Sequence, residues 1–261
     1  MAPTTYRKLQ DKHVLVIGGS SGIGLGVAEA ALANGANVTI SSSSPTKVAA
    51  AVSHLAASYP DRAVRGIAVD LSSKETAEAD LESVFAQVSS SPLGTINHVV
   101  YTAADALSLG ALDTVTPDLI HQAAQMRMVV PILTGKVAAR YLPKTNLSSI
   151  TISSGVAADK SIKGWSVISY FAGGLVSLAK ALAVDLAPVR VNVVQPGYVD
   201  TGLWSFLTPD QKAAVVKSTE EKVPTGMFGK VEDVAEAYIW LLKDGNATGS
   251  VARTDGGLML V

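Results

Sequence analysis

The 261 residues include 21 Lys and Arg and 22 Asp and Glu, giving a net charge of −1, so the charge balance does not favour nucleic acid or an anionic membrane as a partner. Because the chain has no cysteine, disulfides, thiolate metal sites and a thiol nucleophile are excluded. The opening residues are polar and do not form a signal peptide. Uninterrupted apolar stretches fall far short of the ~20 residues that a membrane span requires. We therefore expect one cytoplasmic domain.

Short apolar runs alternate with helical patterns in chain order. Runs of strand length lie at residues 13–17, 37–41, 64–69, 96–101, 149–153, 189–195 and, more weakly, 249–252, and helical patterns lie at 22–34, 45–58, 74–90, 116–142, 166–187 and 231–242. Continuous Val, Ile and Ala runs indicate strands covered on both faces, as in a parallel sheet. The alternation predicts a single α/β domain over residues 1–261, a Rossmann-type doubly wound parallel sheet of about seven strands with helices on both faces.

Residues 201–225 interrupt this alternation. An insertion at this point lies above the carboxyl ends of the strands, where ligands bind in such sheets. We therefore expect a lid-like segment, in which Trp204 and Phe206 cover a substrate or, alternatively, shield a partner.

The turn after the first predicted strand has the glycine pattern of a dinucleotide cradle. Gly18 follows the strand, and Gly22 and Gly24 open the next helix. Glycine lets the backbone approach a pyrophosphate closely, and the helix N-terminus supplies free N–H groups and a positive dipole end. The alternative is a glycine-rich turn that binds no ligand.

The end of the second predicted strand favours NADP(H) over NAD(H). NAD-binding sites usually place an acidic residue here, where it binds the ribose hydroxyls. This chain has a serine run that includes Ser42, Ser43 and Ser44, with Lys47 one turn later. Hydroxyl groups and an ammonium suit a 2′-phosphate, which a carboxylate would repel. The alternative is a polar loop in which Lys47 is only solvated.

With these motifs, the chain resembles the short-chain dehydrogenase/reductase (SDR) superfamily from about residue 10 to its end. Residues Gly18–Gly24 match the family's glycine cradle, Asp70-Leu71 the pair that lies against adenine, and Thr102-Ala103-Ala104 its Asn-Ala-Gly motif in a degraded form. Residues Pro196-Gly197 match the turn beside the nicotinamide, and Thr201 matches the threonine that holds the carboxamide. The cradle, the serine run and this resemblance together imply a set of cofactor-binding residues: Gly18, Ser20, Ser21, Gly22, Ile23, Ser42, Ser43, Ser44, Lys47, Asp70, Leu71, Thr102, Ala103, Ala104, Arg127, Pro196, Gly197, Val199, Thr201 and Leu203.

The catalytic positions depart from that family. Counting back from the matched end of the active-site helix places the family's tyrosine at Ile168 and its lysine at Ala172. Tyr170 cannot substitute, because two residues along a helix are ~200° apart around its axis. The family's serine remains as Ser154, with an uncertainty of one residue in the alignment, and its helix asparagine falls at Arg127.

The missing tyrosine and lysine restrict the chemistry. A ketone that accepts hydride becomes an alkoxide, which needs a positioned proton donor, and neither Ile168 nor Ala172 can supply one. An iminium carbon already carries positive charge, so hydride transfer leaves a neutral amine and requires no donor. We therefore expect hydride transfer to an iminium-like or conjugated substrate rather than ordinary alcohol–ketone interconversion.

A narrower resemblance points to the same chemistry. The chain is similar to the fungal SDR-derived reductase/Diels–Alderases of the malbrancheamide and paraherquamide alkaloid pathways, which also lack the tyrosine–lysine pair; the similar segments are residues 103–105, 126–128, 164–166 and 257–261. The resemblance implies NADPH-dependent reduction of a cyclic iminium followed by a guided cycloaddition. The arginine and the substrate-stacking tryptophan of those enzymes fall at Arg127 and Trp165, whereas their catalytic aspartate is replaced by Ile162. With Ser154 from the wider family, Arg127 and Trp165 make up the expected catalytic residues.

Each of these residues also has a structural interpretation. Arg127 could close an ion pair, Trp165 could anchor the core or an interface, and Ser154 could pack or cap. The function likewise has alternatives, namely a redox-inactive NADP(H)-binding scaffold or sensor, and a cofactor-assisted cyclase without net redox.

Further expectations concern metals and partners. The four histidines show no metal-ligand spacing, so no metal site is expected. The helical patterns at 116–142 and 166–187 carry small and apolar residues on more than one face, which predicts burial in a homodimer or homotetramer. The other expected partner is a small-molecule substrate, and neither nucleic acid nor a membrane is expected.

Overall fold

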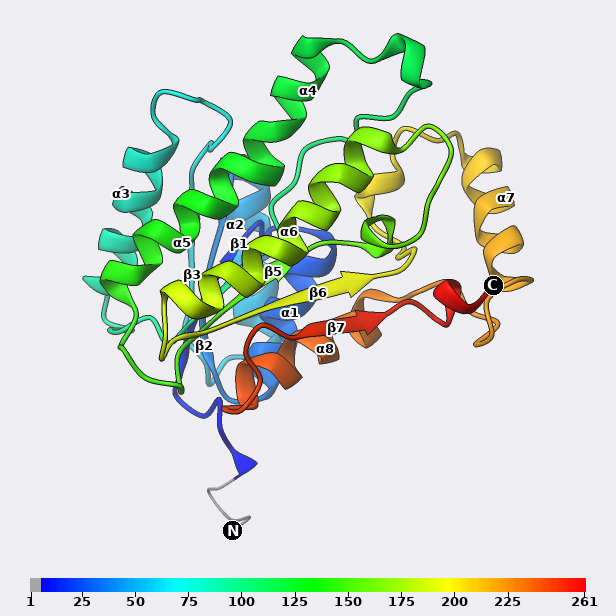
Figure 1. The fold of residues 1–261 in the computed structure, drawn as a ribbon. Coiled ribbons are helices and arrows are strands. Elements are labelled where there is room, and N and C mark those ends of the chain that lie inside the picture. Colours follow the sequence, from blue (N-terminus) through cyan, green and yellow to red (C-terminus); the bar gives the residue numbers. More distant parts are fainter. Residues whose placement is uncertain (1–5) are drawn as a thin grey trace.

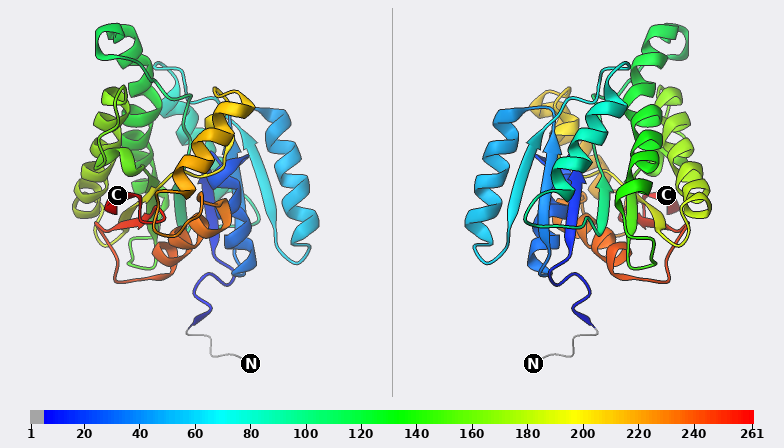
Figure 2. Two further views of the ribbon diagram at one scale, coloured as in Figure 1. Left: turned by 90° about the vertical axis from the view of Figure 1, so that its right-hand side faces the viewer. Right: turned by 90° about the vertical axis from the view of Figure 1, so that its left-hand side faces the viewer.

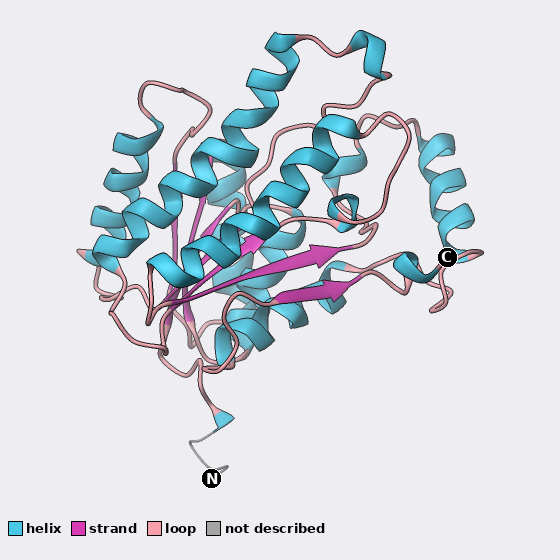
Figure 3. Ribbon diagram, in the orientation of Figure 1, coloured by secondary structure: helices cyan, strands magenta, loops and turns pink. Residues whose placement is uncertain are grey.

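The computed structural model describes residues 6–261 and shows one sheet between two layers of helices (Figure 1). Its seven strands stand in the order β3-β2-β1-β4-β5-β6-β7, and they all run parallel, as Figure 3 shows. The strands are β1 (His13–Ile17), β2 (Asn37–Ser42), β3 (Val64–Ala68), β4 (His98–Tyr101), β5 (Ser149–Ser153), β6 (Arg190–Pro196) and β7 (Val251–Thr254). The predicted doubly wound parallel sheet is thus confirmed.

Helices cover both faces of the sheet. They are α1 (Gly22–Ala33), α2 (Pro45–Ser58), α3 (Ala77–Ser89), α4 (Pro117–Ala124), α5 (Val130–Tyr141), α6 (Ser166–Asp185), α7 (Pro209–Glu220) and α8 (Val231–Lys243). Side chains of α1, α2 and α8 contribute to one buried cluster, and side chains of α3, α5 and α6 contribute to another. Figure 2 shows the two helical layers on either side of the sheet. Because side chains alternate along a strand, Val14 and Val16 of β1 join the first cluster, and Leu15 and Ile17 join the second.

The strand order reverses between β1 and β4. The strands β2 and β3 lie on one side of β1, and β4 to β7 lie on the other. At the reversal, Ile17 pairs with Ser41 of β2 and with Tyr101 of β4. In open α/β sheets, ligands bind in the crevice outside the carboxyl ends of the strands at such a reversal. The topology therefore predicts a ligand site at the loops that follow β1, β2 and β4.

The single helix predicted over residues 116–142 is interrupted. A π-helical turn, Gln125–Val129, separates α4 from α5. Pro131 explains the interruption, because it has no N–H to donate to the carbonyl of Arg127 four residues earlier and its ring crowds that carbonyl. The wider turn sets Arg127 at the junction of two helices rather than on a regular helical face.

The insertion at 201–225 contains a helix that apolar periodicity did not predict. Helix α7 buries only Thr219, so it has no apolar stripe to detect. Its start is nevertheless encoded locally: Pro209 occupies the first turn, and Thr208 and Gln211 form a capping box, which satisfies two free N–H groups at the helix start.

Helix α6 departs from the expectation about membrane-length segments. It has 20 residues and a mean hydropathy of 1.7, which is long and apolar enough to cross a membrane by length and composition alone. Counting only uninterrupted apolar runs missed it, because small and polar residues are interspersed with the apolar ones. A third of this segment is buried within the chain, where Phe171, Leu175 and Leu182 lie on its inward side. A core helix of a folded domain has the same composition.

Charged or titratable side chains, Arg190 and His98 among them, lie within the core at the amino ends of the strands. Arg190 is 3% exposed and donates to the carbonyls of Asn146, Leu241, Leu242 and Ala247, which ties β6 to the end of α8. Fully buried His98 lies with Nδ1 2.8 Å from the hydroxyl of Ser149. Burial, together with the charges of Arg190 and Lys12, lowers the pKa of His98 to about 3.

We expect His98 to make the fold acid-sensitive. In the unfolded chain it titrates near pH 6.5, so below that pH the unfolded state gains a proton that the native state does not bind; by linkage this costs about 2 kcal/mol of unfolding free energy at pH 5. In the variant His98→Asn, the loss of unfolding free energy between pH 7 and pH 5, measured by urea titration, should be smaller by about that amount. The matched control His121→Asn, at an exposed position of α4, should keep the wild-type slope. Identical slopes in all three proteins would contradict this assignment.

Candidate active site

The turn between β1 and α1 is built by close backbone contacts that only glycine permits. Gly18 has φ of +94°, and a Cβ there would lie 2.5 Å from the backbone nitrogen of Ala103. A Cβ on Gly24 would lie 2.2 Å from the carbonyl oxygen of Gly18. Thr102, which follows β4, donates its hydroxyl to the carbonyls of Ile17 and Gly18 at 3.2 Å. The turn is therefore fixed against the neighbouring strand.

The N-terminus of α1 is left open by this turn. Ser21 is the N-cap residue, but its side chain makes no capping hydrogen bond to the helix. The first N–H groups of a helix have no partner within it, and together with the helix dipole they attract an anion such as a phosphate. A cavity lies directly in front of this helix end.

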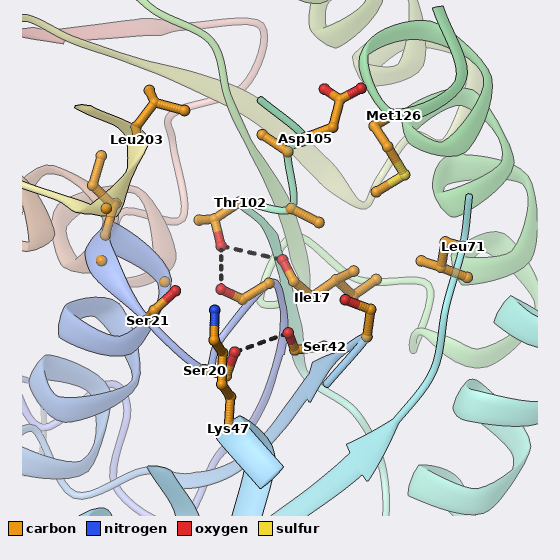
Figure 4. Close-up of a pocket in the computed structure, with 18 of the residues that line it drawn as sticks. Ile17, Ser20, Ser21, Ser42, Lys47, Leu71, Thr102, Asp105, Met126 and Leu203 are labelled. Atoms are coloured by element: carbon orange, nitrogen blue, oxygen red, sulfur yellow. Dashed lines mark hydrogen bonds between the residues drawn. The ribbon is translucent and has the colours of Figure 1, made fainter. Parts of the chain in front are cut away.

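We call this space the first cavity; its volume is about 540 Å³. It lies over the carboxyl ends of β1, β2 and β4, as Figure 4 shows. The structure brings most of the predicted cofactor residues together on its walls: Gly18, Ser20, Ser21, Gly22, Ile23, Ser42, Ser43, Lys47, Asp70, Leu71, Thr102, Ala103, Ala104, Thr201 and Leu203. Sequence reasoning missed other lining residues, among them Ser72, Asp105 and Met126, and it assigned Phe206, which also lines the cavity, only to the lid-like segment.

The serine run divides between two roles. Ser42 and Ser43 line the first cavity, and Ser20 donates to the hydroxyl of Ser42 at 2.8 Å. Ser44, in contrast, is not among the lining residues, and its hydroxyl accepts from the N–H of Lys47 at 3.3 Å. Ser44 is the N-cap of α2, so the capping geometry turns it away from the cavity and places Lys47 in the first turn of that helix.

The charged groups of the first cavity are few. Among the residues lining it within the described part of the chain, Lys47 is the one cation, and in Figure 4 its side chain extends from α2 toward the turn that carries Ser20 and Ser21. At the other end, Asp70 accepts from the backbone N–H of Ser72 at 3.0 Å. That hydrogen bond, with the Ser72 hydroxyl, holds the pKa of Asp70 below its ordinary value.

A second cavity of about 200 Å³ adjoins the first. The two share a wall made of Ile23, Thr102, Ala103, Ala104, Met126, Thr201 and Leu203. The second cavity receives the remaining predicted residues: Arg127, Ser154, Trp165, Pro196, Gly197 and Val199. Its lining also includes four residues that sequence reasoning either missed or assigned only to the insertion, namely Tyr101, Leu107, Tyr198 and Trp204.

Apolar groups occupy the two positions at which the sequence resemblance places the SDR family's tyrosine and lysine. Ile168 and Ala172 both line the second cavity and are 6% and 9% exposed. Tyr170 lies on the opposite side of α6, where it is 74% exposed and contacts Phe171 edge-on. It is absent from the cavity lining, as the rotation of the helix requires.

The serines of the second cavity direct their hydroxyls into the protein. Ser154 donates to the carbonyl of Ala172 at 2.8 Å, and Ser153 lies 2.6 Å from the hydroxyl of Tyr238. Tyr101 donates to the carbonyl of Met126 at 2.7 Å. The hydroxyl protons of Ser154 and Tyr101 are therefore engaged by protein carbonyls, and the Ser153 hydroxyl is engaged by that of Tyr238.

Arg127 secures the loop that follows β4. Its side chain is 9% exposed, forms an ion pair with the carboxylate of Asp105 and donates to the carbonyls of Asp105 and Ala106 at 2.8 and 3.1 Å. Desolvation lowers the pKa of Arg127, although the nearby Tyr101 opposes this. Asp105 lines the first cavity and Arg127 the second, so the pair stands between them.

Trp165 forms one end of the second cavity. It is the N-cap residue of α6 and packs with Ala157, Ile168 and Ala172. The neighbouring Asp159 is engaged elsewhere, because it accepts from Gln195 at 3.1 Å and from Arg253 at 2.7 Å.

Carboxylates are absent from the second cavity. In the described chain its lining contains no Asp or Glu, and Ile162 is not part of it. Within residues 6–261, no group of three His, Asp or Glu side chains is placed to hold a metal ion.

The chain matches a known family and known proteins over nearly its whole length. The model of the SDR-like Rossmann domain matches residues 6–261. The short-chain dehydrogenase/reductase fsr5 of Gibberella fujikuroi is 42% identical over 97% of this chain and 96% of its own length. The short-chain dehydrogenase/reductase malC of Malbranchea aurantiaca is 36% identical over the whole of both chains.

Solved structures agree with these sequence matches. The MalC reductase/Diels–Alderase structure from Malbranchea aurantiaca superposes with a TM-score of 0.92, at 35% identity, over 98% of this chain and 100% of that one. A small-chain dehydrogenase solved in complex with NADPH superposes with a TM-score of 0.76, at 25% identity, over 96% of this chain and 99% of that one.

Proposed function

Because the chain belongs to the short-chain dehydrogenase/reductase family of oxidoreductases, we propose that it is an NADPH-dependent reductase of secondary metabolism that transfers hydride to an activated, iminium-like or conjugated substrate. One observation carries this proposal. The second cavity adjoins the glycine cradle, yet it presents Ile168 and Ala172 where the family resemblance places a proton donor and its lysine.

The residues of the first cavity fit a nicotinamide dinucleotide. The backbone of Gly18 and Gly24 leaves no room for side chains, and the free N–H groups of α1 face the space in front of the helix, which suits a pyrophosphate. When bound, the cofactor would supply the hydride. Ser42, Ser43 and Lys47 would hold the 2′-phosphate of NADPH, because hydroxyls and an ammonium satisfy a phosphate group.

We expect NADPH to bind ~10- to 1,000-fold more tightly than NADH, where each tenfold corresponds to about 1.4 kcal/mol of binding free energy. Replacing the one cation of the first cavity in Lys47→Met should remove about tenfold of this preference and leave NADH affinity unchanged. The control Lys144→Met alters an exposed lysine that does not line the cavity. Calorimetric titration of each protein with both cofactors measures the ratio, and equal or tighter binding of NADH by the wild type would refute the assignment.

The second cavity suits an acceptor that needs no proton. Its lining combines aromatic side chains, including Tyr101, Trp165 and Trp204, with one cation, Arg127, whose charge is matched by Asp105. Aromatic faces attract cations, and burial of the walls excludes water from a charged substrate. The Ser154 hydroxyl donates its hydrogen bond to the Ala172 carbonyl, so it can accept a hydrogen bond from a ligand but not donate one.

We expect NADPH to be consumed with cyclic iminium salts and not appreciably with simple ketones, because the absent general acid is typically worth about 10²–10⁴ in rate. A panel of both substrate classes, followed by the loss of NADPH absorbance, tests this. Arg127→Ala should lower turnover more than the control Tyr170→Phe, because only Arg127 holds the loop between the cavities. The double variant Ile168→Tyr with Ala172→Lys should not improve the native reaction.

Three results would count against this function. Ketone reduction at ordinary rates, or loss of activity in Tyr170→Phe, would show that the active-site helix is misassigned. Tight NADPH binding with no consumption across the whole panel would instead favour a redox-inactive scaffold or a cyclase.

We propose further that the chain forms a homodimer or homotetramer through the helices α4, α5 and α6. Their outer faces carry exposed apolar side chains, including Met128 at 42%, Ile132 at 45% and Tyr170 at 74%. On α6, a Cβ at the exposed Gly174 would meet nothing within 4 Å, so a second helix could approach closely there. Burial in such an interface accounts for the apolar composition of α6.

We therefore expect light scattering to give a multiple of 26.9 kDa at micromolar concentration. Gly174→Glu should shift the protein toward the monomer, because the new carboxylate fits the isolated chain but cannot be buried unpaired in an interface. The control Gln87→Glu adds the same charge at an exposed position of α3 and should leave the mass unchanged. A monomeric wild type would overturn the proposal.

A further inference from the structure

The hydroxyl of Tyr198 differs from the other serine and tyrosine hydroxyls that line the second cavity. Those of Tyr101, Ser153 and Ser154 are all engaged with groups of the protein. For Tyr198, the described residues provide no hydrogen-bond partner, although the residue is partly buried and lines the same cavity. The Tyr198 hydroxyl is not among the buried polar atoms that lack a partner in the described chain, so solvent reaches it, and a ligand in the cavity can take the place of that solvent.

The backbone of Tyr198 is held firmly in place. The residue follows β6 and the Pro196-Gly197 turn, at the start of the chain segment that leads into the insertion. Its carbonyl accepts from the N–H of Gly229 at 3.0 Å, and the next residue, Val199, forms a bridge with Gly229. A Cβ on Gly229 would lie 2.6 Å from the Tyr198 carbonyl oxygen, so the two segments are in direct contact.

The ring of Tyr198 is fixed as well. It meets the ring of Trp204 edge-on, with centroids 5.2 Å apart, and lies 6.4 Å from that of Phe228. It also packs against a small buried cluster of Val156, Val223 and Leu258. A tyrosine placed by packing on several sides presents its hydroxyl with little loss of conformational freedom on binding.

We propose that Tyr198 binds the substrate by donating a hydrogen bond from its hydroxyl to an uncharged oxygen or nitrogen of the molecule in the second cavity. This inference rests on the proposed function of that cavity as the substrate site. It assigns Tyr198 to recognition, in contrast to the position of the family's tyrosine, Ile168, which lies on α6.

The protonation state agrees with a donor that keeps its proton. Desolvation raises the pKa of Tyr198 above its ordinary value. Among the cavity-lining residues, the one cation is Arg127, which is already paired with Asp105 and is not among the groups that shift the pKa of Tyr198. The hydroxyl therefore stays protonated through neutral pH.

A matched pair of probes tests the assignment without requiring turnover. The probes are N-methyl-3,4-dihydroisoquinolinium and the same cation carrying an amide group on its benzene ring, each titrated calorimetrically into the complex of the protein with NADP⁺. Tyr198→Phe keeps the ring contacts with Trp204 and removes only the hydroxyl. It should weaken binding of the amide probe by about fivefold to tenfold, the size of one neutral hydrogen bond, and leave the parent cation unchanged.

Two controls separate recognition from damage. Tyr170→Phe should change neither affinity, and Tyr198→Phe should keep the wild-type melting temperature and NADP⁺ affinity. Equal weakening of both probes, no weakening of either, or no binding to the wild-type complex would each overturn the inference. If the wild type shows the expected difference but consumes no NADPH with either probe, the proposed reductase function fails while Tyr198 remains a binding residue.

Discussion

The contact between the β1–α1 turn and the start of the β4 loop is the constraint on which the rest of the site depends. The Cβ of any side chain at Gly18 would lie 2.5 Å from the nitrogen of Ala103, so β1 and β4 could not keep their spacing at the carboxyl ends. The Thr102 hydroxyl donates to the backbone carbonyls of Ile17 and Gly18 and so holds the same two segments together. Because Thr102 and Ala103 belong to the wall shared by both cavities, this one approach positions the α1 helix end and the second cavity together.

Hydrogen bonding within the second cavity is directed into the protein. Ile168 and Ala172 offer Ser154 no polar side chain, and it donates to the backbone carbonyl of Ala172. Arg127 similarly turns to Asp105 and to two loop carbonyls. Ser154 and Arg127 thus hold the walls, and most of the cavity lining is apolar or aromatic.

The fold and the first cavity could be predicted from sequence because their signals are local. Continuous Val and Ile runs mark β1, and Gly18 and Gly24 mark the turn that follows it. The capping role of Ser44 was also encoded locally, by the Pro45 and Lys47 that follow, but the run of identical hydroxyls concealed which serine faces the cavity. The pairing of Arg127 with Asp105 could not be predicted, because it joins the π-helical turn to the loop after β4, and only the folded sheet brings the two together. Tyr198 is similar: its environment depends on Trp204, Phe228 and Leu258, which lie on separate segments.

The π turn between α4 and α5 changes the direction in which the side chains of α5 point relative to those of α4. In an uninterrupted α-helix, residues twelve apart, such as Ile120 and Ile132, would point about 120° away from each other. A π turn absorbs one extra residue without advancing the helical rotation, which reduces the offset to about 20°. Ile120 and Ile132, which are 41% and 45% exposed, therefore fall on the same side of the two-helix unit. The turn that places Arg127 at the cavity also makes one continuous apolar ridge out of two short helices, so the geometry of the interior and that of the surface are set by the same five residues.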